Sequence, residues 1–84
     1  MNKTPVGKAI FDVTLELTSA RKQYPAMNSP HEGYAVILEE LDELWDEVKK
    51  KPTARSKKLM RAEAVQVAAM ALRFIVNVCD GVDP

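Results

Sequence analysis

Carboxylate side chains crowd one short stretch of this chain. Six of the eleven residues in LEELDELWDEV, from Leu38 to Val48, are Asp or Glu, and large apolar residues separate them. A stretch of this kind can form the solvated face of an amphipathic helix. Closely spaced carboxylates can also share a divalent cation, because hard cations such as Mg²⁺ prefer oxygen ligands. Taken by itself, the stretch favours the solvated face.

Glu40 differs from its acidic neighbours. At about 100° per residue, the apolar stripe of a helix over this stretch has its centre near Leu41 and Val48, and Glu40 lies on the flank of the stripe. Glu43 is three residues further along, so the two carboxylates can hold one ion. The side chains that point away from the stripe are those of Glu32, Glu39, Glu43, Asp46 and Glu47.

Length, composition and charge limit what kind of protein this is. The 84 residues make a single small domain, residues 1–84, and a chain of this size buries only about 60% of its unfolded surface. A metal or a partner subunit often supplies the missing stability. Disulfides cannot do so, because Cys79 is the only cysteine. Twelve basic and twelve acidic residues give a formal net charge of zero, so nucleic acid is not an expected partner.

The sequence also predicts a location. No run of about twenty apolar residues is present, so we expect no membrane span. The N-terminal stretch MNKTPVGK is not followed by the apolar core of a signal peptide. A single thiol fits a reducing compartment. We therefore expect a cytoplasmic protein that does not engage membranes.

The first of three predicted helices runs from about Pro5 to Lys22, with Thr4 as its N-cap and proline at its first position. Apolar residues recur at helical spacing at Val6, Ile10, Val13 and Leu17. An alternation that is typical of a strand is formed by Phe11, Val13, Leu15 and Leu17. We predict the helix, because no second strand is available to pair with this one.

The second helix has the clearest start in the chain. Ser29-Pro30-His31-Glu32 matches a capping box, with Ser29 as the N-cap and Glu32 three residues on. The helix runs to about Lys50, because Pro52 lacks the N–H that would continue it. Its apolar stripe comprises Tyr34, Ile37, Leu38, Leu41, Leu44, Trp45 and Val48.

The third helix runs from about Ser56 to Asp80 and ends before Gly81, a residue suited to the position after a helix. It has two apolar faces. One comprises Val65, Ala68, Leu72, Ile75 and Cys79, and the other Val67, Met70, Ala71, Phe74 and Val78. Only a narrow polar strip remains, at Glu63, Gln66, Arg73 and Asn77. Two other helices cannot surround such a helix, so we predict an all-α, three-helix chain that assembles into a homo-oligomer, a dimer or tetramer, through its third helix.

Two acidic motifs on consecutive predicted helices resemble those of a known family. Glu39-Glu40-Leu41-Asp42-Glu43 is an EExxE pattern, and Glu63-Ala64-Val65-Gln66 follows on the third helix. The combination resembles the all-α NTP pyrophosphatase superfamily, which includes MazG-like proteins and dimeric dUTPases. The signature of that superfamily is EExxE on one helix and ExxD on the next. The resemblance covers roughly residues 30–76. This part of the chain is similar to small MazG-like proteins of phage or mobile-element type.

The resemblance implies a helical bundle that hydrolyses a nucleoside triphosphate to a monophosphate and pyrophosphate with Mg²⁺ or Mn²⁺. It implies that Glu40, Glu43 and Glu63 are metal ligands, and that Glu39 is a ligand for a second ion or orients the attacking water. Gln66 stands where the family has Asp, so this ligand would be an uncharged amide. Because many members have more helices, a complete site is expected to need a partner subunit.

Several other side chains have two interpretations each. Seven cations surround the loop between the second and third helices, and they form either a solvated surface or a phosphate contact. These residues are Lys49, Lys50, Lys51, Arg55, Lys57, Lys58 and Arg61. On a buried helix, Arg73 and Asn77 need partners, which are either other helices or the triphosphate and base of a substrate. We also expect His31 at the surface or in the cap, Cys79 in the core, and Trp45 in the core or an interface.

Two functions are favoured at this point, and a third, a small DNA-binding helical protein, rests only on the basic loop. The first is a Mg²⁺-dependent nucleoside triphosphate pyrophosphohydrolase. The second is a non-catalytic helical oligomer of the same fold that binds a nucleotide or a protein partner. Gln66 favours the second function. The first function is favoured by the retained glutamates Glu39, Glu40, Glu43 and Glu63.

Overall fold

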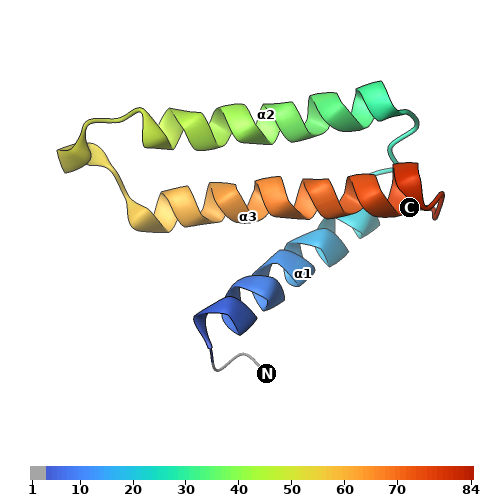
Figure 1. The fold of residues 1–84 in the computed structure, drawn as a ribbon, viewed down its shortest axis with the longest axis horizontal. Helices are drawn as coiled ribbons and strands as arrows, with labels where there is room; N and C mark the ends of the chain where they lie inside the picture. Colours follow the sequence, from blue (N-terminus) through green and yellow to red (C-terminus); the bar gives the residue numbers. More distant parts are fainter. Residues whose placement is uncertain (1–3) are drawn as a thin grey trace.

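The computed structural model describes residues 4–84 and is all-helical, with no strand in this range. Helices α1 (Pro5–Gln23), α2 (Pro30–Val48) and α3 (Lys57–Phe74) follow one another along the chain (Figure 1). A short 3₁₀-helix, η1 (Pro52–Ala54), lies in the loop before α3, and a π-helical turn, η2 (Ile75–Cys79), extends α3. The predicted all-α class and the three predicted helices are therefore confirmed, including the helix over the stretch with the competing strand pattern.

Each of the three helices begins at a hydroxyl side chain. The side-chain oxygens of Thr4, Ser29 and Ser56 accept hydrogen bonds from the backbone N–H three residues on, at 2.9, 3.1 and 3.1 Å. These bonds satisfy N–H groups that have no partner inside the helix. The second half of the predicted capping box is not formed, because the Glu32 carboxylate accepts a hydrogen bond from the Asn28 side chain at 3.4 Å instead.

The end of the third helix is closed by backbone hydrogen bonds around a glycine. Gly81 has a φ of +69°, a left-handed conformation that glycine adopts without a steric penalty. The N–H of Val82 donates to the carbonyl of Val76 at 2.9 Å. The predicted end of this helix before Gly81 is confirmed, although its last turn is π-helical rather than α-helical.

Helices α2 and α3 form an antiparallel hairpin, and α1 crosses α3 at an angle (Figure 1). The core at this crossing is small. Ala20 of α1 packs with Ala69 and Met70 of α3, and four partly buried apolar residues surround them: Val13, Leu17, Val36 and Ile37. An ion pair between Asp12 and Arg61 at 2.8 Å joins the first half of α1 to α3. Helix α3 is therefore the central element that positions both of the others.

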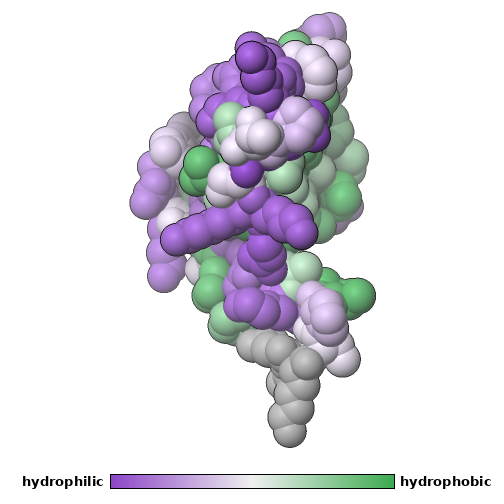
Figure 2. All heavy atoms as spheres, turned by 90° about the vertical axis from the view of Figure 1, so that its left-hand side faces the viewer, coloured by the Kyte–Doolittle hydropathy of each residue, from purple (hydrophilic) through white to green (hydrophobic). Residues whose placement is uncertain are grey.

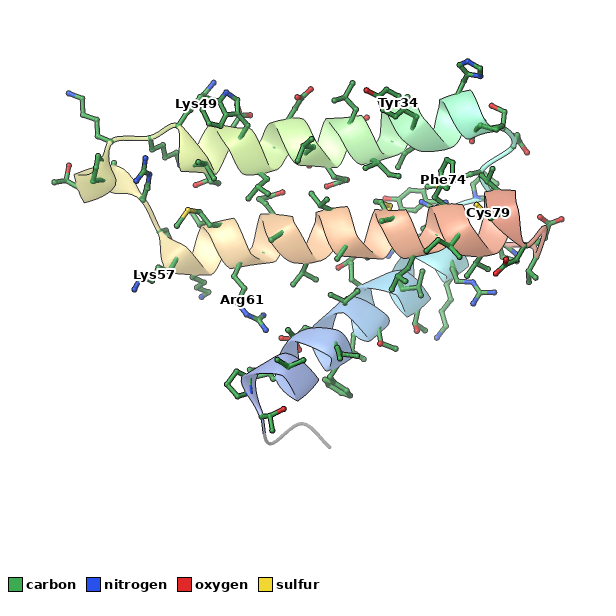
Figure 3. The ribbon with its side chains drawn as sticks, in the orientation of Figure 1. Tyr34, Lys49, Lys57, Arg61, Phe74 and Cys79 are labelled. Atoms are coloured by element: carbon green, nitrogen blue, oxygen red, sulfur yellow. The ribbon has the colours of Figure 1, made fainter. Side chains whose placement is uncertain are left out.

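Gly33 allows α2 to approach the end of α3 closely. A Cβ atom added at Gly33 would lie 2.5 Å from Cδ2 and 2.9 Å from Cε2 of the Phe74 ring, and 3.2 Å from Sδ of Met27. Figure 3 shows the Phe74 side chain between the two helices. The Gly33–Phe74 contact thus sets both the distance and the register of the hairpin.

We expect Gly33→Ala to destabilise the fold by about 1–3 kcal/mol, the usual cost of overpacking. In an open helix position the same change would stabilise by about 1 kcal/mol through helix propensity, so the sign of the effect is diagnostic. Denaturant unfolding followed by circular dichroism measures it. Ala35→Ser on the exposed side of the same helix is the control and should change stability only slightly. A stabilised Gly33→Ala protein would contradict the contact.

Much of the apolar surface of the chain is uncovered. The radius of gyration is 13.9 Å, against about 12 Å for a compact chain of this length. On α2, the predicted stripe is split, because Ile37 faces the core while Leu41 is 47% exposed and Trp45 58% exposed. The prediction that Leu41 marks the centre of the buried face is therefore wrong for the single chain. Close approach at Gly33 turns the other side of α2 towards α3.

The outer face of α3 is also uncovered. Leu72 and Ile75 are exposed, and so is Cys79. The prediction that Cys79 lies in the core is therefore wrong for the single chain, because α1 and α2 pack on the other side of this helix. The presence of two apolar faces on the third helix is confirmed, since one is packed and the other is not.

By length and composition alone, the helix Lys57–Cys79 could also cross a membrane. The criterion concerns length and composition only, so the expectation of no membrane span stays a prediction. Core helices of soluble proteins meet the same criterion. Two polar side chains of this helix, Arg73 and Asn77, are buried against the α1–α2 linker, as expected for a helix that packs within a folded domain.

Candidate metal centre

Three carboxylates converge where α2 lies beside α3. Glu40 and Glu43 are one turn apart on α2, and Glu63 faces them from the first half of α3. One carboxylate oxygen from each residue lies within 4.8 Å of the other two. The antiparallel hairpin produces this meeting, because the Gly33–Phe74 contact at one end fixes which residues are opposite each other further along.

The cluster is short of positive charge. Partial burial, the hydrogen bond to Glu43 and the negative charges of Glu43, Glu63 and Glu39 together raise the pKa of Glu40 to about 7. Each ion pair among residues 4–84 uses other carboxylates, so no Lys or Arg neutralises the cluster. The raised pKa reflects negative charge that no cation of the described chain offsets. An all-oxygen set of this kind, with excess negative charge, fits a hard divalent ion such as Mg²⁺ or Mn²⁺.

The raised pKa of Glu40 makes the stability of the metal-free protein depend on pH. The pKa of Glu40 is about 7 in the folded state and 4.5 in the unfolded state. The folded state therefore binds this proton more tightly than the unfolded state. The resulting stabilisation is fully present below pH 4.5 and is lost as the pH rises through 7. Glu40→Gln, which mimics the protonated acid, should flatten the profile, whereas Asp46→Asn should not. Urea unfolding at a series of pH values tests this expectation, and an unchanged Glu40→Gln profile would contradict it.

An open pocket of about 500 Å³ adjoins the cluster. Glu39, Glu40 and Gln66 line it from the hairpin, and Glu39 is exposed to it. The Gln66 side chain makes no hydrogen bond within residues 4–84. The pocket thus joins the carboxylate cluster to a surface large enough for a small-molecule ligand.

Two buried polar residues, one in α3 and one in η2, hold the linker that closes the far side of this pocket. Arg73 donates a hydrogen bond to the carbonyl of Pro25 at 3.0 Å and lines the pocket. The side-chain Oδ1 of Asn77 accepts a hydrogen bond from the backbone N–H of Met27 at 3.0 Å, and its Nδ2 donates to the carbonyl of Val82 at 2.8 Å. Both side chains therefore have partners in the chain itself, and Asn77 is not among the residues that line the pocket.

The basic residues that were candidates for phosphate contact lie elsewhere. Arg61 pairs with Asp12 and points from α3 towards α1 (Figure 3). Lys58 is exposed in the first turn of α3, and neither residue lines the pocket. Figure 2, which faces the α2–α3 loop, shows mainly hydrophilic side chains over this end of the molecule. The structure thus brings the acidic candidates together but separates Lys58 and Arg61 from them.

The contribution of the first helix to the pocket was not predicted. Glu16, Ala20 and Gln23 line it from α1, and Tyr24 lines it from the linker. Their spacing of four and three residues marks one face of a helix. The sequence carried this signal, but it did not indicate that this face of α1 would meet the acidic hairpin.

The fold and the site define a three-helix protein with an acidic cluster beside an open pocket. Comparisons with protein-family models, with curated proteins and with solved structures each found no match to this chain.

Proposed function

We propose that this protein is a Mg²⁺-dependent nucleoside triphosphate pyrophosphohydrolase of the MazG-like type. The observation that carries the proposal is the convergence of Glu40, Glu43 and Glu63 within 4.8 Å. These are the positions that the EExxE motif and the first residue of the second motif supply. If the acidic residues of α2 only formed a solvated face, nothing would require a carboxylate of α3 to lie beside them.

The proposed division of labour follows from where each side chain lies. Glu40, Glu43 and Glu63 would hold Mg²⁺ or Mn²⁺, which when bound neutralises triphosphate charge and lowers the pKa of bound water. Glu39, exposed in the pocket, would accept the proton of the attacking water or orient it. The free Gln66 amide oxygen would add a neutral ligand. Hydrolysis between the α- and β-phosphates would release the monophosphate and pyrophosphate.

The test is incubation of the protein with a panel of ribo- and deoxynucleoside triphosphates and Mg²⁺. Pyrophosphate and nucleoside monophosphate should form in equal amounts, and chelation of the metal should stop the reaction. Release of inorganic phosphate and a diphosphate would indicate a different cleavage position. If no substrate is hydrolysed with Mg²⁺ or Mn²⁺, the proposal is wrong.

We also propose that the chain functions as a homo-oligomer, a dimer or tetramer. The uncovered face of α3 at Leu72 and Ile75 and the outer face of α2 at Trp45 support this assembly. Burial of such residues contributes about 1.5–3 kcal/mol each. Sedimentation equilibrium should show a dimer or tetramer for the natural chain and a shift to monomer for Ile75→Glu. Thr53→Glu in the exposed loop adds the same charge and should change nothing. A folded natural monomer at micromolar concentration would overturn the assembly.

The second candidate is a non-catalytic oligomer of the same fold that binds a nucleotide or a protein. The amide at Gln66 favours it, because the site holds one negative charge fewer than the family pattern. Nucleotide binding without hydrolysis in the substrate panel would identify this second function.

A further inference from the structure

Tyr24 lies at the end of the pocket opposite to the carboxylate cluster, and we propose that its ring is the stacking platform for the nucleobase of the substrate. This inference rests on the proposed function and adds to it the place where the base binds. Tyr24 is an exposed aromatic residue, with 56% of its surface accessible, and it lines the same pocket as Glu40 and Gln66. Stacking on an aromatic side chain suits every base, because each base has a π-face.

The ring of Tyr24 is held in place although it is exposed. Its backbone N–H donates to the carbonyl of Ala20 at 3.0 Å, which ends α1 at this residue. The Arg73 guanidinium lies over the ring, 5.8 Å from its centre, and is itself anchored to the carbonyl of Pro25. Arg73 itself is buried, with 5% of its surface exposed, so the cation at the ring is fixed in position. A ring that is fixed before binding loses little entropy when a ligand stacks on it.

The spacing along α3 suits a nucleotide. Arg73 is ten residues beyond Glu63, which corresponds to about 15 Å along a helix. Gln66 and Met70 lie between them on the pocket wall. A nucleoside triphosphate whose phosphates lie near the carboxylate cluster can therefore extend along this wall and reach Tyr24 with its base.

The charges around the pocket decide which part of a nucleotide belongs at this end. Glu16 and Glu32 line the pocket outside the carboxylate cluster. Arg73 is the single lining cation among the described residues, and the Pro25 carbonyl and the Tyr24 ring already engage it. A free phosphate would be repelled by these carboxylates. A neutral ring would not be, and its exocyclic amino groups could donate to the carboxylate oxygens. The Nε–H of Arg73 has no acceptor in the described part of the chain. We therefore assign this end to a neutral heteroaromatic ring rather than to phosphate.

The test compares Tyr24→Ala and Tyr24→Phe with Tyr34→Ala. Tyr34 is also exposed, at 64%, but lies on the outer side of α2, away from the pocket (Figure 3). With Mg²⁺, Tyr24→Ala should weaken binding of a nucleoside triphosphate about tenfold or more, the usual effect of losing one stacked base. It should leave binding of inorganic triphosphate unchanged. Tyr24→Phe and Tyr34→Ala should bind both ligands like the natural protein. Circular dichroism checks that each variant is folded.

The outcomes separate this inference from the proposed function. If hydrolysis proceeds and Tyr24→Ala binds nucleoside triphosphates normally, the stacking platform is wrong and the proposed function stands. Equal weakening of inorganic triphosphate and nucleoside triphosphate would also overturn the platform. If no hydrolysis occurs, a nucleoside without phosphates can still test the platform. If it shifts the Tyr24 ring signals in NMR spectra of the natural protein and does not bind Tyr24→Ala, the platform stands and the enzyme proposal fails.

Discussion

Glu63→Gln is expected to lower kcat/KM for nucleoside triphosphates about 100-fold or more, since loss even of groups that only support metal ligands costs 10- to 100-fold. Glu63 is the single α3 carboxylate in the cluster, so its replacement leaves the proposed ion with charged ligands from α2 alone. The variant should also need more Mg²⁺ for half-maximal activity. Steady-state kinetics at several metal concentrations provide the measurement.

The matched control for Glu63→Gln is Asp46→Asn. Asp46 is an exposed carboxylate of α2 that pairs with Lys49 at 3.1 Å and lies outside the cluster. This variant removes the same charge and should keep full activity. A second readout is the pKa of Glu40, which should fall towards its ordinary value in Glu63→Gln because one of the charges that raise it is gone. Full activity of Glu63→Gln would place the catalytic metal elsewhere.

Gln66→Asp is expected to tighten metal binding and to raise hydrolysis, because it adds a carboxylate beside the cluster, as in the ExxD pattern that the second motif resembles. Without metal, the added charge lies near the other carboxylates, so the free energy of unfolding should fall by about 1 kcal/mol. With Mg²⁺ the loss should reverse, since an ion at 100 times its dissociation constant stabilises the fold by about 2.7 kcal/mol. Thermal unfolding with and without Mg²⁺ measures both effects.

A structural role for Gln66 would give the opposite result. If its amide joined helices, Asp would be too short and would lack the N–H donors, and the variant would lose stability equally with and without metal. The absence of a Gln66 hydrogen bond within residues 4–84 favours the metal-dependent outcome. Gln66→Asn is the control, because it shortens the side chain without adding charge and should gain no stability from Mg²⁺.

The sequence predicted the helices well because their ends are decided locally. Thr4, Ser29 and Ser56 each cap the helix that follows, and Gly81 ends the last one. These signals act over three or four residues, so they can be recognised without knowledge of the fold. The meeting of Glu40, Glu43 and Glu63 was expected only from the motif resemblance, because it depends on how two helices pack.

The rotation of α2 could not be predicted from its apolar stripe. The stripe is broad enough that either half could face α3, and its geometric centre at Leu41 is on the uncovered side. The deciding contact is between Gly33 and Phe74, which are 41 residues apart in the sequence. The same limit applies to Tyr24, whose position in the pocket depends on the crossing of α1 over α3.

The hairpin also divides the chain into parts that tolerate changes of length differently. One residue inserted into α3 between Glu63 and Phe74 would rotate one of them by about 100° relative to the other, so either the carboxylate cluster or the Gly33–Phe74 contact would be lost. The loop that contains η1 carries no such constraint, because it joins the two helices at the end beyond the cluster. Longer loops cost little stability, so among natural variants of this protein, insertions and deletions should collect between Val48 and Lys57 and be absent from the helical segments that connect the cluster to Gly33.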